Sequence, residues 1–279
     1  MADWGKLGGL GNVEDRRGMG GAALGGGGLI GVLLLFAFNI LSGNPPDVGS
    51  VLQQLQQGTG QQQQVDQGQF AGADQYEVFA GKVLGSNNQL WSGVLGQNGL
   101  TYSDPRLVLF RQATQSACGA ATSAVGPHYC PADRTIYLDE TFFDELRTRF
   151  GAQGGDVAEA YVIAHEVGHH VQNELGIMEQ VQRAEQAEAN ELSIKLELQA
   201  DCFAGIWANS VSKAGVLEPG EIREAIDAAE AVGDDRIQQS IEGRISPESW
   251  THGSSEQRAQ WFSTGFDSGN PGRCDTFRH

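Results

Sequence analysis

Residues 156–176, DVAEAYVIAHEVGHHVQNELG, decide the fold of this chain of 279 residues. Apolar residues recur there at helical spacing and the stretch ends at a glycine, which together predict a helix of the protein core. Asp156, with Glu159 three residues later, predicts a capping box at the start of that helix. The motif H-E-x-x-H inside it places His165 and His169 on one face, one turn apart.

Two imidazoles in this arrangement can hold one divalent ion, and the intervening Glu166 could take a proton from zinc-activated water. A chance match on a surface helix is the alternative, because short motifs give such false positives. The neighbours disfavour it. Residues 161–164, YVIA, are apolar or aromatic, so the imidazoles are expected at a buried face, where an unpartnered pair would be costly. We therefore predict zinc at His165 and His169 and a catalytic role for Glu166.

A third ligand is needed, because catalytic zinc takes three protein ligands and keeps one position open. A third histidine at the usual spacing is excluded, since Gln172 and Leu175 stand where that pattern requires glycine and histidine. A carboxylate must serve instead. The run ELQAD places Glu197 and Asp201 on one face of a second predicted helix, over about 191–213, among apolar neighbours.

We predict Glu197 as the third zinc ligand and one zinc ion per chain. Asp201, one turn further, is expected to accept a hydrogen bond from the far ring nitrogen of one ligand histidine and to fix its tautomer. Two solvated surface acids would be the commoner fate of such a pair. Glu188 and Glu191 are the alternative ligands, but neither has an acid four residues later in so apolar a setting.

The rest of the domain shows shorter signals. Runs at 107–110 and 135–138, bounded by turn residues, predict strands of a small sheet. Residues 76–95 have helical spacing that is interrupted at 85–87, which predicts two short helices. Pro219 marks the start of a further helix.

Near the C-terminus, Ser254 with Gln257 predicts a helix that begins with a capping box. Helices thus dominate the second half of the chain. We expect one α+β domain over residues 74–279, mainly helical and with a small sheet.

Residues 20–42 predict a single transmembrane helix before this domain. No charged side chain occurs from 20 to 41, and 29–41, LIGVLLLFAFNIL, is almost wholly apolar. A cleavable signal peptide and a buried core helix are the alternatives. Basic residues precede the span and the next one is Lys82, so the positive-inside rule predicts a cytoplasmic tail, 1–19, and an extracytoplasmic domain. The expected location is therefore the bacterial cell membrane, crossed once.

Residues 43–73 carry ten glutamines between positions 53 and 69, with few apolar groups, which predicts a flexible linker rich in Gln and Gly. The whole chain has 35 acidic and 18 basic residues, a formal charge of −17, which opposes nucleic acid as a partner. Excess acid that keeps an exposed domain soluble explains this charge more simply than an acidic function does.

Four cysteines suit an oxidising compartment. Cys118 and Cys130 enclose a short loop, which leaves Cys202 and Cys274 to join the C-terminal segment to the core, and we predict these two disulfides. Four thiolates on one zinc ion is the alternative, but the sequence has no C-x-x-C pair.

Four segments together resemble the bacterial "putative neutral zinc metallopeptidase" family and, more broadly, the zincins that have a glutamate ligand. They are HEVGHH (165–170), ELQADCFAG (197–205), HGSSEQRAQWF (252–262) and CGAATSAVGPHYCPADRTIYLD (118–139). The resemblance covers about residue 74 to the C-terminus. It implies a zincin-like fold and a membrane-tethered hydrolase that cleaves peptides or proteins, without naming a substrate.

The resemblance also implies a role for His252, because similar zincins use a histidine distant in sequence to donate a hydrogen bond to the oxyanion. Packing near the cap of the last helix is the alternative for His252. Arg258 is expected to be exposed, with an ion pair to an acid near the site as the alternative. His128, His170 and His279 have no spacing that recommends them as ligands. A non-catalytic zinc-binding module and a hydrolase of cell-wall amides remain the alternative functions.

Overall fold

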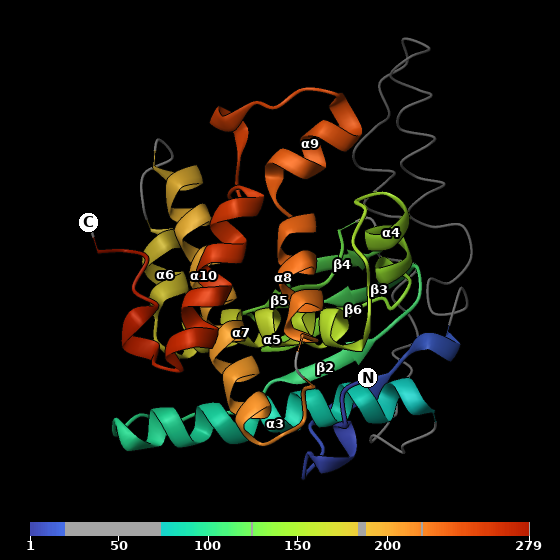
Figure 1. The fold of residues 1–279 in the computed structure, drawn as a ribbon, viewed down its shortest axis with the longest axis vertical. Helices are drawn as coiled ribbons and strands as arrows, with labels where there is room; N and C mark the ends of the chain where they lie inside the picture. Colours follow the sequence, from blue (N-terminus) through green and yellow to red (C-terminus); the bar gives the residue numbers. More distant parts are fainter. Residues whose placement is uncertain (20–73, 124, 184–187, 219, 279) are drawn as a thin grey trace, which may run out of the picture.

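The computed structural model describes residues 1–19, 74–123, 125–183, 188–218 and 220–278. Helices predominate over two small sheets in this part of the chain, so the α+β prediction is confirmed. Figure 1 shows the larger sheet and helix α5 in the middle of the molecule, with α3 along one side and α7, α8 and α10 on the other.

The larger sheet has four strands in the order β1-β2-β6-β5. They are β1 (Asn12–Asp15), β2 (Arg106–Leu109), β6 (Thr135–Leu138) and β5 (His128–Cys130). β2 is parallel to both β1 and β6, whereas β5 is antiparallel to β6 and forms an edge. The two predicted strands are β2 and β6, the central pair, and a separate hairpin joins β3 (Ala113–Ser116) to β4 (Gly119–Thr122).

Helix α5 (Asp156–Glu174) is the helix that the motif predicted, and it is buried along most of its length. It contacts the sheet on one side and α7 and α8 on the other, which explains why it is buried nearly all round. The predicted capping box is wrong. Gly155, at φ 113°, is the N-cap, and the Asp156 carboxylate instead accepts a 2.7 Å hydrogen bond from Trp4 Nε1.

Helix α3 (Gln75–Gln97) is one continuous helix, so the predicted break at 85–87 is wrong. A Cβ on Gly85 would lie 2.9 Å from the backbone nitrogen of Gly11, so the glycine allows the N-terminal segment to pass close to the helix. Ser86 Oγ accepts a 2.9 Å hydrogen bond from Trp207 Nε1 of α7. The residues that looked like a break therefore form two interfaces.

Helices α7 (Ala189–Lys213) and α10 (Ser255–Ser268) match the helices predicted over about 191–213 and after Ser254, and α8 (Ile222–Ala231) follows Pro219 as expected. Ser254 and Gln257 form the predicted capping box of α10. α7 and α10 cross at two glycines: a Cβ on Gly205 would lie 2.0 Å from the Phe262 carbonyl oxygen, and one on Gly265 would lie 1.9 Å from that of Cys202.

Both predicted disulfides are present, Cys118–Cys130 and Cys202–Cys274. The second joins α7 to the tail that follows α10. Shorter elements complete the described part, namely η1 (Trp4–Lys6), η2 (Arg17–Met19), α4 (Phe142–Thr148), α6 (Ile177–Gln182), α9 (Asp234–Glu242), η3 (Pro247–Ser249) and η4 (Pro271–Arg273).

The expected single-pass topology is corrected. The predicted transmembrane helix, 20–42, and linker, 43–73, lie outside the described residues, and no helix within the described residues is long and apolar enough to span a bilayer. Strand β1 of the supposed cytoplasmic tail pairs with β2 in register, Val13 opposite Leu107. Because two strands of one sheet lie on the same side of any membrane, residues 1–19 and the rest of the fold cannot be separated by a bilayer.

Candidate metal centre

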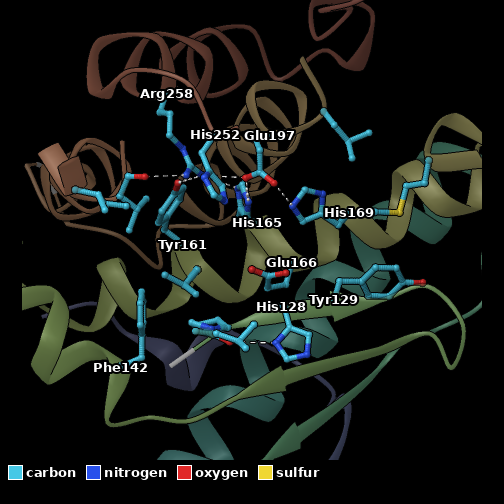
Figure 2. A pocket seen from close by; sticks show the side chains of 18 residues that line it. His128, Tyr129, Phe142, Tyr161, His165, Glu166, His169, Glu197, His252 and Arg258 are labelled. Atoms are coloured by element: carbon cyan, nitrogen blue, oxygen red, sulfur yellow. Dashed lines mark hydrogen bonds and ion pairs between the residues drawn. The ribbon is translucent and has the colours of Figure 1, made fainter. Parts of the chain in front are cut away.

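Two helices bring the three predicted ligands together. His165 and His169 of α5 and Glu197 of α7 each offer one ligand atom, and these atoms lie within 4.8 Å of one another. The Glu197 carboxylate reaches both rings, at 3.2 Å from His165 Nε2 and 3.3 Å from His169 Nε2 (Figure 2). A Cβ on Gly168 would lie 2.9 Å from the carbonyl oxygen of Ala200, so this glycine allows α5 and α7 to approach closely enough.

Each imidazole has a hydrogen-bond acceptor at its far nitrogen. His165 Nδ1 lies 2.8 Å from Asp201 Oδ1, the partner that the sequence predicted, and His169 Nδ1 lies 2.9 Å from Gln172 Oε1. An acceptor at Nδ1 keeps the proton there and leaves Nε2 free to act as a ligand atom. Two Nε2 atoms and one carboxylate form a donor set that fits zinc, with three protein ligands on one side of the ion.

Asp201 lies in a buried ionic cluster. Its side chain is 0% exposed. Its carboxylate accepts hydrogen bonds from Arg258 Nε at 2.8 Å, from Arg258 Nη2 at 3.0 Å and from the Tyr161 hydroxyl at 2.6 Å. Arg258, with a side chain only 4% exposed, was expected at the surface, and that expectation is wrong. Burial opposes ionisation of Asp201, but Arg258 and His165 outweigh it and lower its pKa.

The acids also act on the ligand histidines. Burial disfavours a charged ring, yet Asp201 and Glu197 raise the pKa of His165 to about 10. In the protonated ring the Nδ1–H group donates a hydrogen bond to Asp201, so the proton that a metal ion must displace is the one on Nε2. Metal binding at neutral pH should therefore release a proton from the cluster.

Glu166 is buried beside the predicted ligands, at 6% exposure, and lines the same cavity of about 460 Å³. Among the described residues its Oε2 atom has no hydrogen-bond partner. A buried carboxylate oxygen without a partner is costly and calls for an explanation, and a catalytic role or contact with an ion is one such explanation. Figure 2 shows the Glu166 carboxylate next to the two rings.

His252 also lines this cavity, and its side chain is 48% exposed. Asp234, at the start of α9, was not singled out from the sequence, yet it holds the loop that carries His252. One carboxylate oxygen of Asp234 accepts hydrogen bonds from the backbone N–H groups of Thr251, His252 and Gly253, at 2.8, 2.6 and 3.0 Å. The other oxygen lies 3.1 Å from His252 Nδ1. Burial opposes its charge, but His252 and these backbone groups lower the pKa of Asp234.

The model of the family described as Putative neutral zinc metallopeptidase matches residues 2–277. The chain belongs to this family. The match confirms the resemblance, and it reaches further towards the N-terminus than residue 74.

Relatives of this family member include the uncharacterized protein YpfJ of Escherichia coli (strain K12), 45% identical over 280 residues, or 95% of each chain. Uncharacterized protein Rv2575 of Mycobacterium tuberculosis (strain H37Rv) is 46% identical over 219 residues, which cover 74% of this chain and 73% of the relative. The uncharacterized protein Mb2605 of Mycobacterium bovis gives the same values. No solved structure matches the chain significantly.

The other candidate residues of this family member lie outside the ligand set. Glu188 and Glu191 are exposed at the start of α7, and neither lines the cavity. His170 is fully buried between the Tyr129 hydroxyl and the Ser103 carbonyl. His128 does reach the cavity, from the edge strand β5, whereas His279 lies outside the described residues.

The remaining wall of the cavity is largely apolar. Its side chains come from the loop before β5, from helices α4, α5, α6, α7 and α9, and from the end of α8. They are Val125, Phe142, Val162, Met178, Leu196, Val232 and Ile237. An apolar wall with a few polar groups at one end is the usual form of a small-molecule or side-chain binding pocket.

Proposed function

We propose that this protein is a zinc-dependent peptidase in which His165, His169 and Glu197 hold the ion and Glu166 is the general base. One observation carries the proposal: a buried carboxylate oxygen without a partner lies in the same cavity as three converging ligand atoms. Membership of the metallopeptidase family supports the same reaction class.

Zinc, when bound to such a donor set, supplies a Lewis acid that lowers the pKa of water and polarises a carbonyl group. Glu166 would accept the proton of the attacking water through its free oxygen and deliver it to the nitrogen of the leaving amine. No covalent intermediate with the protein is required. Arg258 and Tyr161 would keep Asp201 charged beside His165, and so hold that ring in place.

His252 would donate a hydrogen bond to the oxygen of the scissile carbonyl as negative charge develops there. Its Nδ1 atom is oriented by Asp234, so its other ring nitrogen is the one available to a substrate. The apolar wall of the cavity favours substrates with a bulky apolar side chain next to the cleaved bond, because burying such a side chain there is favourable.

The test is the Glu166→Gln variant, which keeps the shape of the side chain and removes its basicity. We expect it to bind zinc as the wild type does and to hydrolyse peptides at least about 100-fold more slowly, because general bases contribute roughly 100- to 10,000-fold. Glu159→Gln on the same helix is the matched control, because Glu159 does not line the cavity.

A digestion of a peptide library, with and without a chelator, would supply the assay and the sequence preference. Full hydrolysis by Glu166→Gln would refute the role of Glu166. A wild-type protein that binds zinc tightly but cleaves no peptide or other amide would instead favour a non-catalytic zinc-binding module.

A further inference from the structure

The two ligand histidines are held in different ways. His165 is oriented by a charged group, Asp201, which Arg258 neutralises. His169 is oriented by a neutral amide, Gln172, whose side chain is 0% exposed. Nothing in the proposed reaction uses Gln172, yet a fully buried amide must have its donors and its acceptor satisfied.

The amide of Gln172 continues into a chain of hydrogen bonds. Gln172 Nε2 donates to the Leu196 carbonyl at 2.7 Å and to Gln199 Oε1 at 3.1 Å. Gln199 Nε2 in turn donates to the Cys274 carbonyl at 2.9 Å. The chain thus runs from the C-terminal tail, through α7, to a ligand histidine on α5.

The direction of this chain is fixed by its two backbone ends. A carbonyl group can only accept a hydrogen bond, so the Leu196 and Cys274 carbonyls each require an amide N–H group from their glutamine. Turning either amide over would place two oxygens against each other. With both amides fixed, Gln172 can offer His169 Nδ1 only an acceptor.

We propose that Gln172 and Gln199 are positioning residues of the metal site, and that the Cys202–Cys274 disulfide holds in place the tail carbonyl on which they depend. The consequence is that the proton of His169 stays on Nδ1 and its Nε2 atom faces Glu197. The inference rests on the proposed zinc site, and it assigns to the C-terminal tail a part in metal binding.

The tail is attached close to this chain of bonds. The disulfide joins residues 72 positions apart and fixes Cys274 against α7, and Thr276 Oγ1 donates to the Lys195 carbonyl at 2.6 Å. A second cavity, of about 600 Å³, is lined by both Gln199 and Cys274. If the tail detached, water from this cavity would compete for the Gln199 amide, whose orientation would no longer be fixed.

The experiment measures zinc affinity by competition with a chromophoric chelator. We expect Gln172→Met and Gln199→Met to weaken zinc binding about 10- to 100-fold, the usual effect of removing a partner of a ligand histidine. The double variant Cys202→Ser with Cys274→Ser should weaken it similarly. When the two cysteine changes are combined with Gln199→Met, the loss of zinc affinity should be little larger than in Gln199→Met alone, because both changes remove the same hydrogen bond.

Matched controls separate this effect from a general loss of packing. Asn88→Leu removes another buried amide, which bonds the Tyr102 hydroxyl, and removal of Cys118–Cys130 deletes the other disulfide. Both should lower stability and leave zinc affinity within about twofold of the wild type. An equal loss of affinity in these controls would overturn the inference.

A second readout is the NMR signal of the ring protons in the zinc-loaded protein. The Nδ1 proton of His169 should exchange with water faster in the glutamine variants, while that of His165, held by Asp201, should not change. Unchanged zinc affinity and exchange in both glutamine variants would overturn the inference, whereas a wild-type protein that binds no zinc would overturn the metal site itself. Additive losses from the disulfide and Gln199 variants would overturn the role of the disulfide.

Discussion

Replacement of Arg258 by Met should cost a large part of the stability of the fold. Met fills much of the same volume but leaves Asp201, at 0% exposure, with only His165 and the Tyr161 hydroxyl as partners. Removing one member of a buried ion pair typically costs about 3–5 kcal/mol, because the other charge remains buried. A whole domain is usually stable by only about 5–15 kcal/mol.

Urea unfolding of the metal-free protein measures this loss without a contribution from zinc binding. Arg149→Met is the control. It removes an exposed i,i+4 pair with Glu145 at 3.3 Å, and its effect should stay within about 0.5 kcal/mol. The double variant Asp201→Asn with Arg258→Met should lose less than the sum of the two single losses, since each single change leaves one charge of this buried pair without the other. A loss below about 1 kcal/mol in Arg258→Met would show that Asp201 does not depend on the guanidinium.

Three further outcomes follow from the structure. Burial raises the pKa of Glu159 to about 7 from its ordinary 4.5. Between these two values the folded state keeps a proton that the unfolded state has lost, so the free energy of unfolding falls as pH rises from about 4.5 to about 7. Glu159→Gln should therefore be more stable than the wild type at pH 8, by roughly 1–3 kcal/mol, and no more stable near pH 4.5, when unfolding is measured at both; equal gains at both would contradict this. Gly265→Ala should destabilise by about 1–3 kcal/mol or more in urea, because its Cβ would lie 1.9 Å from a carbonyl oxygen of α7, whereas Gly93→Ala in α3 meets nothing within 4 Å and should not destabilise. Asp234→Ala should lower kcat by less than the roughly 100-fold expected for His252→Ala and leave zinc affinity unchanged; a kcat equal to that of the wild type would remove Asp234 from the site.

Spacing along helices predicted which side chains meet at the candidate metal site. His165 and His169 are one turn apart, as are Glu197 and Asp201, and both pairs lie on helices whose apolar neighbours indicated burial. A helix carries its own geometry, so residues on one helix can be related from the sequence. The relation between the two helices could only be inferred from the number of ligands that zinc needs.

Residues that act through contacts distant in sequence were missed. Arg258 was expected at the surface because arginine usually lies there, and only the fold brings it next to Asp201. Gln172 was noted only because it stands where the pattern with three histidines requires a glycine. Amide side chains have no spacing rule comparable to that of metal ligands, so neither Gln172 nor Gln199 could be found before the helices were placed.

Segments near both ends of the described chain contact helix α5 or the residues that orient it. Trp4 donates a hydrogen bond to Asp156 at the first turn of α5, and hydrogen bonds through Gln199 and Gln172 link the Cys274 carbonyl to His169 in the same helix. Segments near both ends thus position the helix that carries two of the three proposed ligands. A boundary drawn at residue 74 from composition would remove Trp4 and strand β1, because a stretch with one buried valine and several charges resembles a solvated tail until its partner strand is known.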